Sequence, residues 1–315
     1  PFGAEEFINK MVHYVPGSRD SVVKFFDLAE EIRLAQAYSS AVNGKTDSSV
    51  MVSKYGNFVR CGSYSVNEVL KTLKMPKKAV DIMNAYWCYL GAHCDDLSFV
   101  HYASMVNRYI KRGASMPKSR SHEISLAFIE RIRELGGDVL FNTEAVKILT
   151  DEKDGGVSGV LLDDGTEIAT RHVVANVMPH VVFGRMMDKV PLDEIKAANT
   201  RKFAGRGYTM FLGLNKSADE LGIENHNYFL YDTMDTVKQY EMMKKIKDNS
   251  VQATVCLNRA YPECSPEGTT MMYFTTLFME DDWANVTPRD YVKTKESVAS
   301  RMIDRFDQDT GSRIR

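Results

Sequence analysis

The most constraining feature of this sequence is the segment 121–176, in which a helical period gives way to strand periods within a few residues. Ile124, Phe128 and Ile132 recur at helical spacing, and a Gly-Gly pair follows, as at the end of an amphipathic helix. Short apolar runs separated by turn residues come next. This order predicts a helix, a strand, a β-hairpin and one further strand.

The expected strands of this segment are bounded by turns, and the strongest turn signal is Asp163-Asp164-Gly165. The pattern predicts strands at 138–142, 145–150, 157–162, 166–170 and 172–176. The last of these is short and apolar, which is typical of a buried strand.

The sequence on either side divides into a helical part and a strand-rich part. Residues 1–112 read mainly as helices, with a capping box expected at Ser65 and Glu68 and a short hairpin at 51–61. Residues 191–315 predict a short helix, several longer strands and a final helix. Loops join most of these strands, so we expect a mostly antiparallel sheet backed by helices, and an α+β fold for the chain.

The composition describes an ordinary globular protein and excludes several classes of function. Hydrophobic residues make up 44% of the 315 residues, charged residues make up 26%, and the net charge is -2. This balance gives no reason to expect nucleic acid as a partner. Five cysteines without C-x-x-C spacing predict neither a disulfide framework nor a metal site. We expect a reduced, cytoplasmic compartment.

The first candidate binding site is the loop that leads into the helix at residue 121. Pro117, Lys118, Ser119 and Arg120 precede the free N–H groups of a helix N-terminus, which suits an anion such as a flavin diphosphate. Read alone, the same residues favour a solvated, well-capped turn.

Two strand ends are further candidates for contact with a nucleotide-type ligand. The backbone at Ala145 can meet an adenine without needing any particular side chain, and Asn176 ends an apolar strand, where ligands collect in α/β sheets. Core strands explain these patterns at least as well. His180 reads as a helix-start residue, and no histidine has the spacing of a metal site or a nucleophilic triad, so no catalytic side chain is assigned.

The methionine content allows two interpretations. The chain has 17 methionines, including the pairs Met242-Met243 and Met271-Met272. Methionines and aromatic residues on a sheet can line an adaptable apolar pocket. Composition alone favours the simpler interpretation, in which they form the core.

Several of these runs together resemble the phytoene-desaturase-like FAD oxidoreductases, which include carotenoid desaturases, carotenoid isomerases and retinol saturase. The family's Pro-Lys loop, Gly-Gly pair, Asn-x-Glu strand start, Val-Val-x-Asn-x-x-Pro-His run and Ala-Pro-Glu-Gly turn are similar to residues 116–120, 136–137, 142–144, 173–180 and 261–269. The likeness covers most of the chain and is strongest from Gly113 onward.

The resemblance implies an FAD cofactor and a division of the chain into three parts. Residues 1–112 would be the helical part of a substrate domain, 113–190 part of a Rossmann-like FAD-binding domain of the glutathione-reductase type, and 191–315 the substrate-domain sheet and terminal helix. The cofactor-binding candidates are then Pro117, Lys118, Ser119, Arg120, Ala145 and Asn176. The sequence has no G-x-G-x-x-G, so we expect an internal fragment that binds FAD weakly or not at all outside its full-length parent.

The resemblance further implies that the parent desaturates or isomerises an apolar polyene-type substrate held against the sheet of 207–278. Two alternatives stay open: an amine-oxidase-like flavoenzyme, and a flavin-independent module that binds an apolar ligand. An apolar substrate is compatible with peripheral membrane contact. The oligomeric state stays open.

Overall fold

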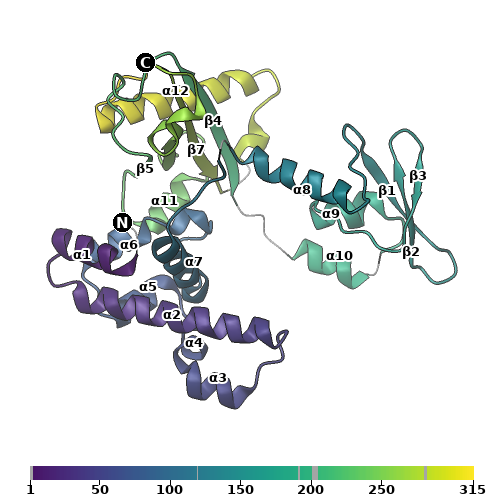
Figure 1. Cartoon of the computed structure of the whole chain (residues 1–315), viewed down its shortest axis with the longest axis horizontal. Helices are drawn as coiled ribbons and strands as arrows, with labels where there is room; N and C mark the ends of the chain where they lie inside the picture. The colour runs from purple at the N-terminus through teal and green to yellow at the C-terminus, as the bar shows by residue number, and fades with distance from the viewer. Residues whose placement is uncertain (1–2, 119, 191, 201–204, 280–281) are drawn as a thin grey trace. The chain divides into compact units, whose positions relative to one another are not determined.

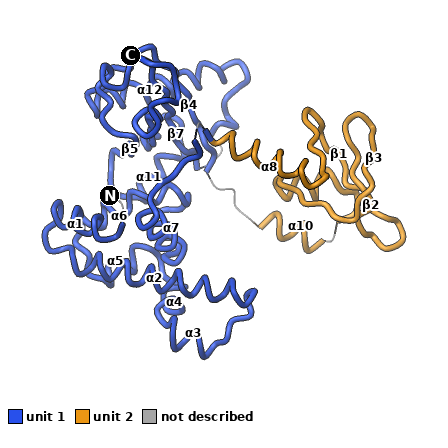
Figure 2. The backbone as a smooth tube through the Cα atoms, viewed as in Figure 1, with its two compact units in different colours: residues 1–120, 204–315 blue, residues 121–203 orange. Residues whose placement is uncertain are grey.

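The structure is a computed structural model that describes residues 3–118, 120–190, 192–200, 205–279 and 282–315. The chain forms two compact units (Figure 2). Unit 1 combines Pro1–Arg120 with Ala204–Arg315, and unit 2 is the intervening Ser121–Phe203. The expected helices and antiparallel sheets are both present, so the α+β fold is confirmed.

The amino-terminal part of unit 1 is helical (Figure 1). Its elements are α1 (Ala4–Tyr14), α2 (Arg19–Ala41), α3 (Ser48–Lys54), α4 (Gly56–Cys61), α5 (Val66–Thr72), α6 (Lys77–Asn84), the 3-10 turn η1 (Trp87–Tyr89) and α7 (Phe99–Arg112). The capping box at Ser65 and Glu68 is confirmed at the start of α5. Helices α2 and α7 pack together, and the rings of Phe25 and Phe99 meet edge to face at 5.7 Å.

The hairpin expected at 51–61 is wrong, because this segment belongs to α3 and α4. The Asp47 side chain accepts hydrogen bonds from the first free N–H groups of α3. Glu31, on α2, accepts from the backbone N–H groups of Asn57 and Phe58 at 2.7 and 3.1 Å. This contact satisfies the start of α4 from a distant helix, so the local sequence did not reveal it.

The carboxy-terminal part of unit 1 contains a four-stranded antiparallel sheet. Its strands are β4 (Arg206–Leu214), β5 (Asn227–Leu230), β6 (Gln252–Cys256) and β7 (Thr270–Phe278), in the order β4-β7-β6-β5. Helix α11 (Thr236–Met242) follows β5, and α12 (Tyr291–Thr310) ends the unit. The short turns η3 (Leu257–Arg259), η4 (Pro262–Cys264) and η5 (Asp282–Asn285) complete it.

Unit 1 has two hydrophobic cores. The larger lies among the amino-terminal helices and also includes Met243, Val251 and Met279 from the carboxy-terminal part. The smaller lies between the sheet and α12, where Phe274 and Phe306 are fully buried. Segments separated by more than one hundred residues therefore share one core.

Unit 2 begins with α8 (His122–Glu134) and contains a small antiparallel sheet of the order β1-β2-β3. Its strands are β1 (Ala145–Thr150), β2 (Val157–Leu162) and β3 (Glu167–Ala169), followed by α9 (Pro179–Val181), the π-helical turn η2 (Val182–Met186) and α10 (Leu192–Asn199). The hairpin predicted at the Asp-Asp-Gly turn is confirmed. Gly165 has φ 86°, a backbone conformation that favours glycine.

The strands expected at 138–142 and 172–176 are wrong. Both segments lie outside the strands of the sheet, and Leu140, Phe141 and Val174 are 59, 61 and 99% exposed. A strand needs a neighbour for its N–H and C=O groups, and the sheet of unit 2 contains only β1, β2 and β3 among the described residues. The apolar pattern was read correctly, but this structure gives these segments no partner strand.

The boundaries between the two units lie after residues 120 and 203, whereas the sequence predicted domain boundaries after residues 112 and 190. The assignment of these ranges to a substrate domain and an FAD-binding domain stays a prediction. No described helix is both long enough and apolar enough to cross a membrane.

Candidate functional site

The two faces of the β4-β7-β6-β5 sheet have different surroundings. Side chains alternate between the faces of a strand, and one set packs against α12. This set includes Tyr208 and Met210 on β4, Met272 and Phe274 on β7, and Tyr228 on β5. The alternate residues of each strand therefore form the other face, called here the open face.

A row of mainly apolar side chains crosses the open face. Phe211 on β4 is paired with Tyr273 on β7, Tyr273 with Val255 on β6, and Val255 with Asn227 on β5. The rings of Phe211 and Tyr273 lie 6.2 Å apart, and Phe211 is 77% exposed. The row therefore runs from an exposed aromatic ring at the β4 edge to a polar amide at the β5 edge.

A second row lies beside the first. Thr209 is paired with Thr275, Thr275 with Ala253, and Ala253 with Phe229. The hydroxyl oxygens of Thr209 and Thr275 are 3.1 Å apart, so each can satisfy the other. The two rows together give a surface with aromatic and aliphatic groups and no charged side chain.

Three tyrosines adjoin the β5 end of the open face. Tyr86 precedes η1, Tyr89 ends it and Tyr109 lies on α7; we call these three residues the tyrosine cluster. The Tyr109 ring is 5.7 Å from that of Tyr86 and 5.9 Å from that of Tyr89, and the Phe229 ring is 6.2 Å from Tyr86 and 5.7 Å from Tyr89. These contacts extend the aromatic surface from β5 to the amino-terminal helices.

Burial keeps Tyr86, Tyr89 and two neighbouring side chains uncharged. Burial raises the pKa of Tyr86 and Tyr89, and the nearby Tyr109 raises both further. Burial also raises the pKa of the Cys88 thiol and, more strongly, of the Tyr231 hydroxyl, which donates to the Ala85 carbonyl oxygen at 2.5 Å. These groups are therefore neutral near neutral pH, and Cys88 is no thiolate nucleophile.

The open face can bind and orient an apolar molecule, but it offers no side-chain acid, base or nucleophile. Among the described residues, no three histidine, cysteine or carboxylate side chains are placed to hold a metal ion. His93 Nε2 lies 3.2 Å from Asp96 Oδ2, without a third ligand. A redox reaction at this surface would therefore depend on a bound cofactor.

The loop expected to contact a cofactor lies at the end of Pro1–Arg120, the first of the two segments that form unit 1. Pro117 is half-buried, while Lys118 and Arg120 are exposed; Ser119 lies outside the described residues. Arg120 donates its backbone N–H to the Lys118 carbonyl oxygen at 3.1 Å. Both basic side chains are exposed, and no contact between described residues assigns an anion to them.

The other two cofactor candidates lie in unit 2. Ala145 begins β1, opposite Leu162, and Asn176 lies in the irregular segment that leads to α9. Both are exposed. They are available for contact with a ligand, and no hydrogen bond between described residues joins them.

The described residues fit only part of an FAD molecule. The Ser121 side chain makes no capping hydrogen bond at the start of α8, so first-turn N–H groups remain available for an anion. The sequence, however, contains no glycine-rich phosphate loop. Within unit 2, Ala145 and Asn176 are exposed for contact with a cofactor, while the pyrophosphate would need another anchor.

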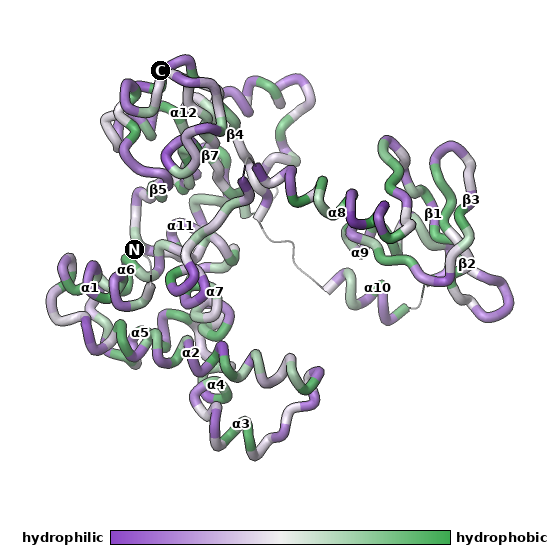
Figure 3. Tube along the Cα trace, viewed as in Figure 1, coloured by the Kyte–Doolittle hydropathy of each residue, from purple (hydrophilic) through white to green (hydrophobic). Residues whose placement is uncertain are grey.

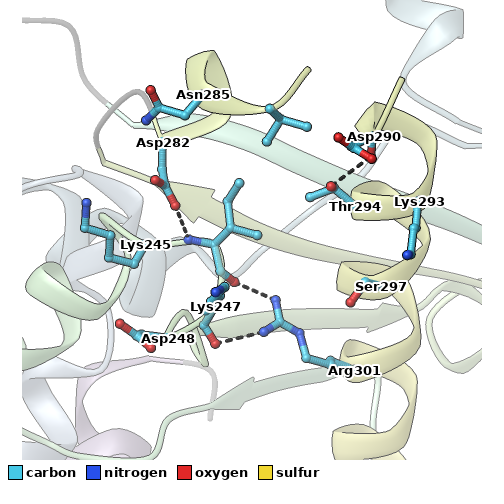
Figure 4. A pocket seen from close by; sticks show the side chains of 12 residues that line it. Lys245, Lys247, Asp248, Asp282, Asn285, Asp290, Lys293, Thr294, Ser297 and Arg301 are labelled. Atoms are coloured by element: carbon cyan, nitrogen blue, oxygen red, sulfur yellow. Dashed lines mark hydrogen bonds between the residues drawn. The ribbon is translucent and has the colours of Figure 1, made fainter. Parts of the chain in front are cut away.

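A polar cavity of about 660 Å³ lies beside α12 (Figure 4). Lys247, Lys293 and Asp282 are among the residues that line it. Arg301 donates to the backbone carbonyl oxygens of Lys247 and Ile246 at 2.8 and 2.5 Å, and so fixes the wall of the cavity. Basic and acidic side chains both line the cavity, and Arg301 links its wall through backbone hydrogen bonds. We therefore interpret the cavity as a structural junction between α12 and the segment before β6.

The methionine pairs divide between the two interpretations. Met243 and Met272 are core residues with 0 and 2% exposure. Met271, by contrast, is 39% exposed, on the open face next to Phe211 and Tyr273. Met271 and Met272 lie on opposite faces of β7 because successive residues of a strand alternate, whereas Met242 and Met243 lie at the end of α11.

The tyrosine cluster was not predicted from the sequence. Tyr86 and Tyr89 belong to the longest apolar run of the sequence, 85–92, which was not interpreted as a binding surface. Their partners Tyr109 and Phe229 are distant along the chain, so only the register of β5 and the position of α7 bring them together. The aromatic spacing in 86–89 was the one local signal.

Residues 30–305 match the family model of the flavin containing amine oxidoreductases. All-trans-retinol 13,14-reductase from Danio rerio is 20% identical over 96% of this chain and 53% of its own length. Chloroplastic prolycopene isomerase from Arabidopsis thaliana is 21% identical over 62% of this chain and 32% of its own length. The chain thus spans about half, or less, of the length of these curated relatives.

Two solved structures share the fold. An oxidoreductase from Methanosarcina mazei superposes with a TM-score of 0.55 at 15% identity, over 80% of this chain and 54% of that one. A triple mutant of putrescine oxidase gives a TM-score of 0.50 at 12% identity, over 91% of this chain and 59% of that one. These likenesses concern the fold alone.

Proposed function

Since the chain belongs to the flavin-containing amine oxidoreductase family, with relatives among the phytoene-desaturase-like enzymes, we propose that it is the substrate-binding part of an FAD-dependent oxidoreductase. Its substrate is an apolar, polyene-type molecule that lies on the open face. The observation that carries this proposal is the uncharged aromatic row that includes Phe211 and Tyr273. Such a surface suits a long conjugated chain better than a small polar molecule.

FAD, when bound, supplies the hydride or electron transfer of desaturation or isomerisation. The residues of this chain position the substrate and exclude water. Phe211 and Tyr273 contact the apolar body of the substrate. The hydroxyl groups of Thr209 and Thr275 hydrogen-bond to each other and therefore need no polar group on the substrate. The protein therefore contributes orientation and a dry surface.

Unit 2 is, in this proposal, the edge of a Rossmann-like FAD-binding domain. Pro117, Lys118, Ser119 and Arg120 contact the cofactor with Ala145 and Asn176. The exposed apolar side chains of α8 and of 172–177 pack against further sequence of a longer parent polypeptide. Support comes from their exposure and from the missing glycine-rich loop, and the chain by itself is expected to bind FAD weakly or not at all.

The proposal is tested with the parent polypeptide reconstituted with FAD. We expect flavin-dependent turnover of a polyene, and Phe211→Ser should raise its KM roughly tenfold because an aromatic contact is lost. The matched control is Tyr14→Ser, since Tyr14 is an aromatic residue of α1 with 62% exposure. An unchanged KM in Phe211→Ser would contradict substrate binding on the open face. Stoichiometric FAD bound to the isolated chain would contradict the expectation that the anchor for the pyrophosphate lies outside this chain.

An amine-oxidase-like activity is the second candidate. The observation that favours it is the tyrosine cluster, since aromatic rings attract cations. Turnover of an amine but not of a polyene by the same FAD-loaded parent would select this alternative. Polyene binding by a parent without any flavin would instead select the flavin-independent module.

The apolar substrate also bears on where the parent acts. We propose a cytoplasmic enzyme that takes its substrate from a membrane surface by peripheral contact and has no nucleic-acid partner. Co-sedimentation of the parent with phospholipid vesicles is the expected result. Full recovery in the supernatant at physiological salt would contradict the membrane contact.

A further inference from the structure

Helices α3 and α4 are the least buried of the amino-terminal helices. Helix α3 packs against α4, and α4 packs against α2 (Figure 1). No residue of α3 is buried, and the buried residue of α4 is Cys61. Most of this helix pair is therefore accessible to a partner.

Apolar and basic side chains are exposed together on this helix pair. Val52 on α3, Val59 on α4 and Tyr64 just after α4 are 68, 49 and 52% exposed. Lys54 at the end of α3 and Arg60 on α4 are exposed as well. We call these five residues the α3–α4 surface. Apolar groups gathered on an exposed part of a protein indicate a surface that a partner covers.

The α3–α4 surface is basic in a chain that is slightly acidic overall. Residues 48–67 include Lys54 and Arg60 but no aspartate or glutamate, whereas the whole chain has a net charge of -2. The carboxylates that contact these helices, Asp47 and Glu31, accept hydrogen bonds from the backbone N–H groups at the two helix starts. Among the described residues, neither Lys54 nor Arg60 has a carboxylate partner. Their charges are thus left for an anionic partner.

The combination of apolar and basic groups fits the surface of an anionic membrane. Valine side chains can enter the boundary between headgroups and acyl chains, and tyrosine is favoured there because its ring is apolar and its hydroxyl is polar. Peripheral proteins bind through buried apolar area and through attraction to anionic lipids. Each lysine or arginine near such a surface strengthens binding by about fivefold.

We propose that the protein docks on an anionic membrane through the α3–α4 surface, with Val52 and Val59 among the lipid headgroups and with Lys54 and Arg60 against the lipid anions. This inference rests on the peripheral membrane contact proposed above and assigns that contact to two helices. The residues that dock are then different from the residues of the open face that hold the substrate.

The test measures co-sedimentation of this chain with phospholipid vesicles and needs no flavin. Vesicles of phosphatidylcholine with about 30% phosphatidylserine are compared with vesicles of phosphatidylcholine alone, at about 0.15 M salt. We expect roughly thirtyfold tighter binding to the anionic vesicles, as two basic residues allow. The difference should disappear at about 1 M salt, because salt screens the attraction.

Variants of the α3–α4 surface locate the contact. Lys54→Gln combined with Arg60→Gln should remove most of the preference for anionic vesicles, a loss of roughly thirtyfold. Val52→Asp should weaken binding to the same vesicles by roughly tenfold, because a charge opposes insertion and adds repulsion. Circular dichroism checks that each variant is folded.

Two controls exclude other exposed apolar sites. The matched control is Val292→Asp combined with Lys293→Gln, since Val292 is 62% exposed beside an exposed lysine in the first turn of α12. The second control is Phe128→Ser, which removes the most exposed aromatic ring of α8. Both variants should bind anionic vesicles as the wild type does.

Several results would overturn the inference. These are equal binding to the two kinds of vesicle, wild-type binding by Val52→Asp, and a loss in either control as large as that in the Lys54 and Arg60 variant. Failure to bind any vesicle would overturn the inference and leave an acidic protein as the partner that fits these charges.

The inference and the proposed function fail separately. Anionic-vesicle binding that depends on the α3–α4 surface, in a parent that fails to turn over polyenes with FAD, would refute the proposed function alone. Polyene turnover by a parent that binds vesicles equally well with and without Lys54 and Arg60 would refute this inference alone.

Discussion

Helices α7 and α8 have similar lengths and both carry an apolar stripe, yet they differ in what covers that stripe. In α7, of 14 residues, seven are buried, among them Phe99, Val106 and Ile110. In α8, of 13 residues, none is buried, and Phe128 is 67% exposed. Figure 3 shows hydrophobic residues along both helices. An apolar stripe thus shows which face of a helix can be buried. Whether it is buried depends on other segments of the protein that pack against it.

The same contrast holds for the two units. Unit 1 has two cores that hold nearly all the buried apolar residues. Among the described residues of unit 2, the buried apolar side chains are Ile148, Leu162 and Val182. We therefore expect unit 1 to be stable and unit 2 to open easily, and the following predictions test this difference from the largest expected effect to the smallest.

The largest difference is expected for phenylalanine-to-alanine substitutions. Phe25→Ala, at a fully buried position in contact with Phe99, should lower the free energy of unfolding of unit 1 by about 3–5 kcal/mol. Phe128→Ala should change stability by less than about 0.5 kcal/mol. Urea unfolding followed by tryptophan fluorescence checks unit 1, since Trp87 and Trp283 both lie there. Similar losses in both variants would show that α8 is covered in solution.

Helix caps provide a second comparison. Ser65 accepts a hydrogen bond from the Glu68 backbone N–H, so Ser65→Ala should lower the free energy of unfolding by about 1 kcal/mol. Ser121 stands at the same position of α8 but makes no side-chain cap. Ser121→Ala should therefore have almost no effect on circular dichroism melting. A larger loss for Ser121→Ala than for Ser65→Ala would refute this reading of the two helix starts.

The third prediction concerns pH and the contact between α2 and α7. Hydrogen bonds from Arg33, and then from Lys111, lower the pKa of Glu30 to about 2. A lowered pKa stabilises the folded state above the ordinary value near 4.5, and this contribution is lost as the pH falls toward 2. Because the Glu30 side chain is 33% exposed, screening limits the effect of Glu30→Gln at pH 7 to about 1 kcal/mol.

Urea unfolding of wild type and Glu30→Gln across this pH range provides the measurement. The difference between the two curves should shrink as the pH falls toward 2, because about half of the folded wild-type protein then has Glu30 protonated. A constant difference down to that pH would show that Glu30 acts through packing and not through its charge.

The smallest stability effect is expected for a charge placed on the exposed apolar stripe. Ile132→Lys should change the melting temperature little, since Ile132 is 41% exposed, but should reduce binding of an apolar dye. Glu130→Lys, on an exposed site of the same helix, is the control and should leave dye binding unchanged. A marked loss of stability in Ile132→Lys would mean that the stripe is packed.

Much of the fold was predictable because its signals are local. The capping box at Ser65, the hairpin at Gly165 and the antiparallel sheet were each predicted from a few neighbouring residues. The segment 51–61 was misread because Glu31, a distant residue, stabilises the start of α4. The segment 172–176 was misread because a strand pattern does not supply a neighbouring strand.

The family was predicted correctly, and the candidate site only in part. The resemblance to the phytoene-desaturase-like enzymes is supported by the family match and by the relatives. The sheet of 207–278 was expected to hold the substrate, but which residues share its open face depends on cross-strand register. The contact of Tyr89 with Phe229 joins parts of the chain that no local pattern relates. The six cofactor candidates stay predictions.

The hydrogen bond from the Trp87 indole to the side chain of Gln239 spans 152 residues of sequence. During translation, at the usual 5–20 residues per second, the amino-terminal helices would wait roughly ten seconds or more for this partner. Their apolar surfaces would stay open to other molecules meanwhile. Nascent chains of this protein are therefore expected to depend on ribosome-associated chaperones until α11 has emerged.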